Sequence, residues 1–174
     1  LWMETRADER ASPRTLWPEV RSIVMLGMSY APGRDPLALA GEPSRGRISV
    51  YAQGADYHDI VKRALKALAR DIVTAAGPLP LKVFVDTAPV MEKPLAAAAG
   101  IGWQGKHSNL VSREDGSWLF LGAIYLSVAL PPDAPARNRC GSCDACQRAC
   151  PTDAFPAPYR VDARRCVSYL TIEH

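Results

Sequence analysis

Four cysteines stand close together in the stretch CGSCDACQRACP, which runs from residue 140 to residue 151. Their spacing, C-x2-C-x2-C-x3-C followed by proline, is the run with which bacterial two-cluster ferredoxins hold [4Fe-4S] clusters. On this pattern Cys140, Cys143 and Cys146 bind one cluster, and Cys150 binds the other. A structural zinc site is the alternative. Zinc ligands usually come as two separated pairs, so four close thiols with this proline favour iron–sulfur.

The fifth cysteine, Cys166 in DARRCVSYL, is a further candidate ligand. A single cysteine is more often a buried core residue, but Cys150 needs partners for its cluster. Two cubane clusters require more thiolates than the five cysteines of this sequence. We therefore expect a partner or a longer chain to supply the rest. A disulfide framework is disfavoured, because disulfide scaffolds spread their cysteines along a short secreted chain.

Asp86 is the candidate for acid–base chemistry, because it follows the apolar run LKVFV and reads as a strand-end residue. Strand ends are where α/β proteins place their active sites. The alternative is structural: Asp86 or Thr87 would cap a helix expected within residues 89–99. Taken without any other information, these residues favour the capping role.

The elements that must position these residues can be read from hydrophobic spacing and from turn residues. In chain order we expect a buried strand at 21–30, a loop at 31–46, an amphipathic helix from its N-cap Asp56 to Gly77, a strand at 81–86, a helix within 89–99 closed by Gly100, and a hairpin with arms at 109–112 and 117–130 around the turn REDG. This order describes an α/β or α+β layer. The proline-rich stretch PPDAPARNR then leads into a second module. The sequence thus predicts an α/β domain over residues 1–130 and a partial ferredoxin-like iron–sulfur module over residues 131–174.

The composition is that of an ordinary globular protein, with 48% hydrophobic and 22% charged residues among 174. No apolar run reaches the roughly 18 residues that span a bilayer, and no secretory signal is evident. The net charge of +3 permits an acidic partner such as nucleic acid without requiring one. Because the chain begins at Leu1 rather than at methionine, we expect it to be a piece of something longer.

Several segments resemble the epoxyqueuosine reductases, the cobalamin-dependent iron–sulfur enzymes of queuosine biosynthesis. The resemblance rests on FVDTAPVMEKPLAAAAGIGWQGKH, SWLFLGAIYL, CGSCDACQRACPTDAF and VDARRCVSYLTIEH, and more weakly on YAQGADYH and LWMETRADERASP. The cysteine motif is generic, so the segments around Asp86 and Cys166 are the specific ones. The family's proteins are longer: a corrinoid-binding α/β domain, a two-cluster ferredoxin domain and a helical-repeat tail. The resemblance therefore implies a fragment that lacks the C-terminal part.

The resemblance implies an oxidoreductase that reduces epoxyqueuosine to queuosine in the anticodon loop of tRNA. It implies two [4Fe-4S] clusters, fed by an external electron donor, that generate a nucleophilic cob(I)alamin. Asp86 matches the family's proton donor, which reverses the preference for the capping role. A carboxylic acid beside an apolar corrin face keeps its proton at neutral pH, because burial disfavours the charged form. We further expect a cytoplasmic monomer that binds no membrane.

The contacts to cobalamin are expected in GWQGKHSNLV and in the strand that follows. The residues assigned to them are Lys106, His107, Ser108, Asn109, Val111 and Gly122. His107 is interpreted as a hydrogen-bonded structural group, since the resemblance does not imply an axial histidine. The base-off cobalamin motif D-x-H-x-x-G is incomplete here, because Val61 replaces its glycine. Asp56 and His58 are therefore interpreted as residues at a helix start.

Arginines around the cysteines are candidates for tRNA contacts, with an ordinary solvated surface as the alternative. They are Arg137, Arg139, Arg160, Arg164 and Arg165. Three other functions stay open: a ferredoxin-type electron carrier, a corrinoid reductive dehalogenase relative, and a zinc-stabilised RNA-binding module. The carrier leaves the long segment before the cysteines unexplained. Dehalogenases are commonly exported and usually use a tyrosine, not a strand-end aspartate, as proton donor.

Overall fold

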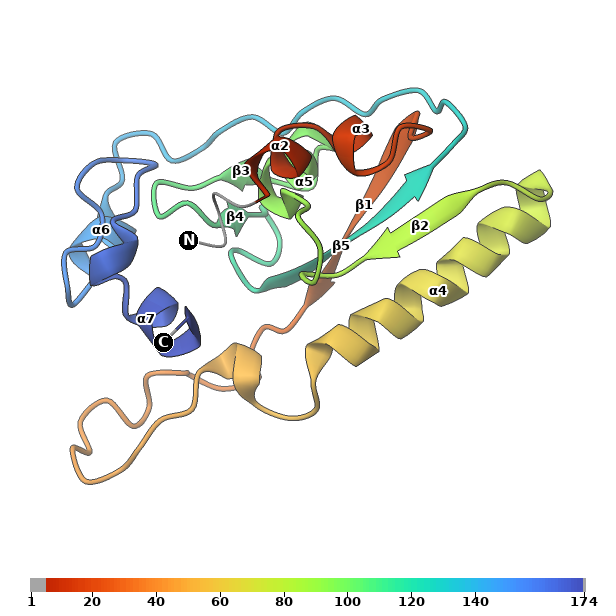
Figure 1. Cartoon of the computed structure of the whole chain (residues 1–174). Coiled ribbons are helices and arrows are strands. Elements are labelled where there is room, and N and C mark those ends of the chain that lie inside the picture. The colour runs from red at the N-terminus through yellow and green to blue at the C-terminus, as the bar shows by residue number, and fades with distance from the viewer. Residues whose placement is uncertain (1–5, 174) are drawn as a thin grey trace.

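The structure is a computed structural model that describes residues 6–173 (Figure 1). Its centre is a three-stranded sheet in the order β1-β5-β2, formed by β1 (Ser22–Ser29), β5 (Leu119–Leu126) and β2 (Leu81–Phe84). The central strand β5 is antiparallel to both neighbours, so Ala123 lies opposite Met25 on one side and Phe84 on the other. The sheet is therefore antiparallel throughout, and β1 and β2 run in the same direction on either side of β5.

Helix α4 (Tyr57–Ala76) follows the short 3-10 helix η1 (Val50–Ala52) and covers one face of the sheet (Figure 1). The Asp56 side chain accepts the backbone N–H of His58 at 2.9 Å, which confirms it as the N-cap. Gly77 ends the helix with a φ of 83°, a conformation that glycine adopts without strain. The predicted start and end of this helix are both confirmed.

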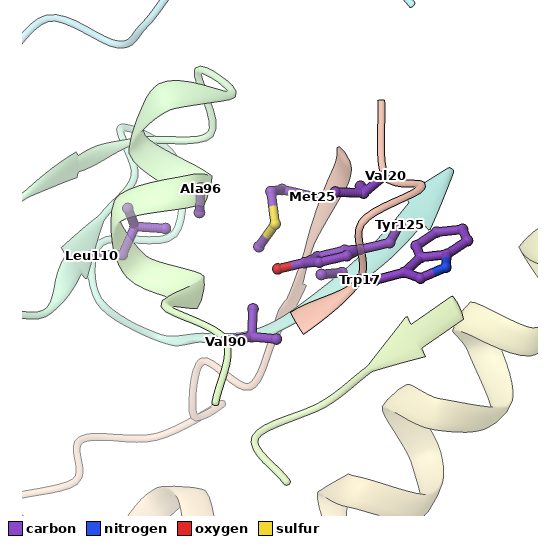
Figure 2. Packing of buried hydrophobic residues seen from close by; sticks show 8 residues of the cluster. Trp17, Val20, Met25, Val90, Ala96, Leu110 and Tyr125 are labelled. Carbon is purple, nitrogen blue, oxygen red and sulfur yellow. The ribbon is translucent and has the colours of Figure 1, made fainter. Parts of the chain in front are cut away.

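The opposite face is covered by α5 (Glu92–Ala98), together with α2 (Ala7–Ala11) and α3 (Pro13–Leu16). Figure 2 shows the core between these helices and the sheet, in which Trp17, Met25 and Tyr125 pack together. Successive residues of β5 point to opposite faces. Tyr125 therefore joins this core, while Ile124 joins the core beneath α4.

Two expectations about the strands are wrong. The first strand is mostly half-buried, with only Met25 fully buried, because β1 lies at the sheet edge. The expected hairpin around REDG is reduced to one bridge between Ser112 and Gly116. Both edges of β5 are already paired with β1 and β2, so it has no edge left for residues 109–112.

Residues 110–111 pair instead with residues 103–104, which gives a small second sheet of β3 (Trp103–Gln104) and β4 (Leu110–Val111). We refer to residues 102–111 as the β3–β4 hairpin. At Gly102 a Cβ atom would lie 2.2 Å from the Val111 carbonyl oxygen, so only glycine fits there. Gly100, with a φ of 82°, closes α5 as predicted.

Residues 129–140 form no helix or strand, in keeping with the predicted connecting segment. The cysteine-rich segment beyond it contains α6 (Ala145–Arg148), η2 (Ala163–Arg165) and α7 (Val167–Glu173). The domain division at residue 130 stays a prediction. The first five residues of the weak match LWMETRADERASP lie outside the described residues. Within residues 6–173, none of the helices has the length and apolar character needed to cross a membrane.

Candidate active site

Asp86 lies two residues beyond β2, on a turn where it adopts a φ of 45°. Its Oδ2 atom accepts a hydrogen bond of 2.5 Å from the Tyr57 hydroxyl, and its backbone N–H donates to Glu92 Oε1 at 3.2 Å. His58 Nε2 lies 3.8 Å from the same Oδ2 atom. The N-cap position of α5 is Met91, with no side-chain cap. The alternative that Asp86 caps this helix is therefore wrong.

Tyr57 is held in place by a stack of aromatic rings. Its ring lies parallel to Phe120, with 4.1 Å between centroids, and Phe120 stacks on Tyr30 at 4.3 Å. Burial, and then the hydrogen bond to Asp86, raise the pKa of the Tyr57 hydroxyl. Tyr57 therefore stays protonated at neutral pH and remains a hydrogen-bond donor to Asp86.

A small cavity of about 160 Å³ lies beside Asp86. It is lined by Tyr57, Asp86, Glu92, Lys93, Leu119, Phe120 and Leu121. Burial raises the pKa of the Glu92 carboxyl and lowers the pKa of the Lys93 ammonium. Lys93 Nζ donates to Asn109 Oδ1 at 2.8 Å. The cavity thus combines apolar side chains from β5 with the exposed carboxyl of Asp86, the half-buried carboxyl of Glu92 and the ammonium group of Lys93.

The residues expected to contact cobalamin do not all lie at this cavity. Lys106 Nζ donates to the carbonyls of Gly141 and Cys143, both at 2.8 Å. It therefore contacts residues 140–146, which we refer to as the cysteine loop. Asn109 accepts from Lys93 at the cavity. Ser108, with a φ of 66°, lines a different cavity of about 680 Å³ together with Trp103 and Tyr159.

Both ring nitrogens of His107 have partners. Nε2 lies 3.1 Å from Ser117 Oγ, and Nδ1 accepts the backbone N–H of Asn109 at 3.2 Å. Burial, and then the nearby Lys93 cation, lower the pKa of this imidazole. His107 is thus a neutral group with no nitrogen left for a metal, in agreement with its structural interpretation.

Val111 and Gly122 have packing roles. Val111 pairs with Trp103 in the β3–β4 hairpin. Gly122 is buried in β5 beneath α4, where a Cβ atom would lie 2.8 Å from Leu65 Cδ1 and 3.2 Å from Val61 Cγ1. Close packing of helix on sheet therefore favours glycine at this position. Contacts of these residues to cobalamin stay predictions.

All five cysteines are free thiols, and two of them accept N–H donors. Trp103 Nε1 donates to Cys140 Sγ at 3.4 Å, and the Ala154 N–H donates to Cys150 Sγ at 3.3 Å. The Ala154 bond, followed by contacts from Thr152, lowers the pKa of the Cys150 thiol. Free thiols that accept N–H donors are a donor set that fits iron–sulfur ligation.

Among residues 6–173 no three histidine, cysteine or acidic side chains are gathered closely enough to hold a metal ion. The fit to an iron–sulfur cluster therefore rests on the spacing of the cysteines and on their donors, and each cysteine's role as a ligand stays a prediction. The five candidate arginines are all exposed. Arg164 pairs with Asp162 at 2.9 Å, and Arg165 lies 3.9 Å from Asp153.

Sequence reasoning did not single out several residues that the fold brings to this region. They are Tyr57, Glu92, Lys93 and Trp103. Tyr57 stands beside His58 in the segment YAQGADYH, and Glu92 and Lys93 belong to the segment that contains Asp86. Trp103 belongs to the segment that contains Asp86 as well, so the resembling segments contained all four residues. Nothing in the sequence marks Trp103 as a partner of Cys140.

Family models match both parts of this chain. The family model "Epoxyqueuosine reductase QueG, DUF1730" matches residues 10–87, and the "4Fe-4S double cluster binding domain" model matches residues 139–174. The epoxyqueuosine reductase of Xanthomonas campestris pv. campestris is 46% identical over 99% of this chain and 49% of that protein. This chain thus spans about half the length of the curated relatives that it matches.

Solved structures give the same result. A crystal structure of epoxyqueuosine reductase with an epoxyqueuosine-modified tRNA-Tyr stem loop matches 94% of this chain and 44% of that chain, with a TM-score of 0.80 and 30% identity. A Bacillus subtilis epoxyqueuosine reductase with its aspartate catalytic loop swung out of the active site matches 95% and 44%, with a TM-score of 0.77 and 27% identity. With both family models matched in chain order, the chain belongs to the epoxyqueuosine reductase family.

Proposed function

We propose that this chain belongs to an enzyme that reduces epoxyqueuosine to queuosine in tRNA. In this proposal the chain contains the catalytic aspartate and cysteine ligands of the iron–sulfur clusters. The observation that carries the proposal is the pair of Asp86 and Tyr57, because it places a carboxyl with a fixed hydrogen-bond donor at a partly apolar cavity. The stem-loop complex of a related structure supports tRNA as the substrate. The aspartate catalytic loop of the Bacillus subtilis protein supports a catalytic role for a loop aspartate.

The groups that the family implies would be held by separate parts of the chain. Cys140, Cys143 and Cys146 would hold one [4Fe-4S] cluster, and Cys150 and Cys166 would contribute to a second. A corrinoid would lie beside Asp86, where the small cavity shares the lining residues Tyr57 and Phe120 with a second cavity of about 510 Å³. When bound, the clusters supply single electrons and the corrinoid supplies a reduced cobalt.

The role of Asp86 is to give a proton to the oxygen that leaves the opened epoxide. Tyr57 donates to Oδ2, so the transferable proton belongs on the other carboxyl oxygen, Oδ1. The side chain is 65% exposed in this structure. Bound substrate and corrinoid would cover it and exclude water, and this covering favours the protonated form of the acid.

Glu92 and Lys93 have supporting roles in this scheme. Glu92 accepts the Asp86 N–H and so holds the turn in its left-handed conformation. Lys93 interacts electrostatically with Asp86 and Glu92, and its ammonium is tied to Asn109. Both residues therefore keep Asp86 in place without touching the position where the proton is transferred.

A visible spectrum of anaerobically reconstituted protein separates the proposed function from its alternatives. The protein used is the extended chain, defined as this sequence continued with the part of the Xanthomonas campestris relative that lies beyond the match. We expect a broad iron–sulfur absorption, and additional corrin bands when cobalamin is added and unbound cofactor is removed. Clusters without retained cobalamin would favour the electron carrier. A colourless protein with zinc would favour the RNA-binding module.

A further inference from the structure

The β3–β4 hairpin connects the cysteine loop to the rest of the molecule. Trp103 donates its indole N–H to Cys140 Sγ at 3.4 Å. Lys106 donates from its Nζ atom to the carbonyls of Gly141 and Cys143, both at 2.8 Å. Two side chains of one short hairpin thus contact the first C-x2-C segment through three hydrogen bonds.

The same hairpin also reaches the cavity beside Asp86. Asn109 accepts a hydrogen bond of 2.8 Å from Lys93, which lines that cavity. The Lys106 carbonyl accepts the backbone N–H of Tyr159 at 2.9 Å, so the segment that follows the cysteine loop is held as well. The hairpin therefore lies between the predicted electron entry and the predicted proton donor and contacts both sides.

Its turn is closely packed. Gly105 N–H donates to the Asn109 carbonyl and Ser108 N–H to the Gly105 carbonyl, each at 2.8 Å. A Cβ atom at Gly105 would lie 2.8 Å from His107 Cε1 and 2.9 Å from Val111 Cγ2. Since contacts this close leave little room for rearrangement, we expect the hairpin to hold Trp103, Lys106 and Asn109 in a fixed relation.

We propose that Trp103 and Lys106 are positioning residues that fix the cysteine loop against the hairpin and raise the reduction potential of the cluster bound through Cys140. Reduction adds negative charge to a cluster and its sulfurs. An N–H donor at a ligand sulfur and a half-buried ammonium on the adjacent carbonyls stabilise that charge, and hydrogen bonds to the sulfurs are one of the factors that set such potentials. The inference rests on cluster binding in the proposed function.

Two substitutions in the reconstituted extended chain test it. Trp103→Phe keeps an aromatic ring and removes the N–H, and Lys106→Met keeps the length and removes the charge. In a redox titration followed by the electron paramagnetic resonance of the reduced cluster, we expect each variant to lower the reduced-to-oxidised ratio at a fixed potential. The expected decrease in this ratio is roughly 3- to 10-fold, which corresponds to the net free energy of one hydrogen bond. Lys66→Met, at an exposed position of α4, is the matched control and should titrate like the parent.

A second measurement requires no iron and uses this chain as it is. Lys106→Met should increase amide hydrogen exchange within residues 140–146, whereas Lys66→Met should leave it unchanged. A parent protein without any cluster signal would refute the proposed function itself. Full iron content with unchanged ratios in both Trp103→Phe and Lys106→Met would overturn the inference about the potential. Unchanged exchange in Lys106→Met would overturn the inference about positioning.

Discussion

Replacing Asp86 by asparagine in the extended chain is expected to lower the single-turnover rate of epoxide reduction by roughly 10²- to 10⁴-fold, the usual contribution of a positioned proton donor. Asparagine has the same shape, and it tolerates the left-handed φ of 45° as well as aspartate does. It still accepts the Tyr57 hydrogen bond but has no acidic proton to transfer. Folding, cluster content and cobalamin binding should therefore be retained while the rate falls.

The assay begins with chemically reduced enzyme, so that electron delivery does not limit the rate. Asp59→Asn, at an exposed position in the first turn of α4, is the control for the loss of one carboxylate. Tyr57→Phe removes only the hydroxyl that orients Asp86, and we expect a smaller loss of roughly 10-fold with substrate affinity unchanged. Equal rates for Asp86→Asn and the parent would remove Asp86 from the mechanism.

Replacing Cys143 by alanine is expected to remove about half of the iron from the extended chain, because three thiolates remain where a cubane needs four. The residue is exposed and its carbonyl bonds to Lys106, so the substitution leaves the backbone contacts of the loop possible. Loss of iron should therefore report the missing sulfur rather than an unfolded loop. Iron and acid-labile sulfide analysis after anaerobic reconstitution measures it.

Ser142→Ala, at the neighbouring exposed position of the same loop, is the matched control and should keep the full iron content. A Cys143→Ala protein with as much iron as the parent would exclude Cys143 as a ligand. The unextended chain should bind less iron than the extended chain, since its five cysteines cannot complete two clusters.

Local signals predicted local structure well. The capping residue Asp56 and the stop at Gly77 gave both ends of α4, because each acts through its own backbone and nearest neighbours. Strand pairing could not be read in the same way. Which strand lies beside β5 depends on contacts between residues far apart in the chain, so the expected hairpin was replaced by pairing with β1 and β2.

The candidate site shows the same difference between local signals and long-range contacts. Spacing marked the cysteines, and the order of the resembling segments marked Asp86. Neither could indicate that the hydroxyl of Tyr57, the first residue of α4, would bond to that carboxyl. The sequence did not indicate that Lys106 contacts the cysteine loop, because this contact arises only when the fold places the β3–β4 hairpin beside residues 140–143.

The most direct test of this account is the conversion of an epoxyqueuosine-modified tRNA stem loop by the extended chain. The protein is reconstituted anaerobically with iron, sulfide and cobalamin and supplied with a chemical reductant, and the nucleosides are identified by mass spectrometry. We predict queuosine as the product, formed at the parent rate only when Asp86 and the cluster cysteines are present. Unchanged epoxyqueuosine, from a protein that holds its full iron and cobalamin, would contradict the proposed function.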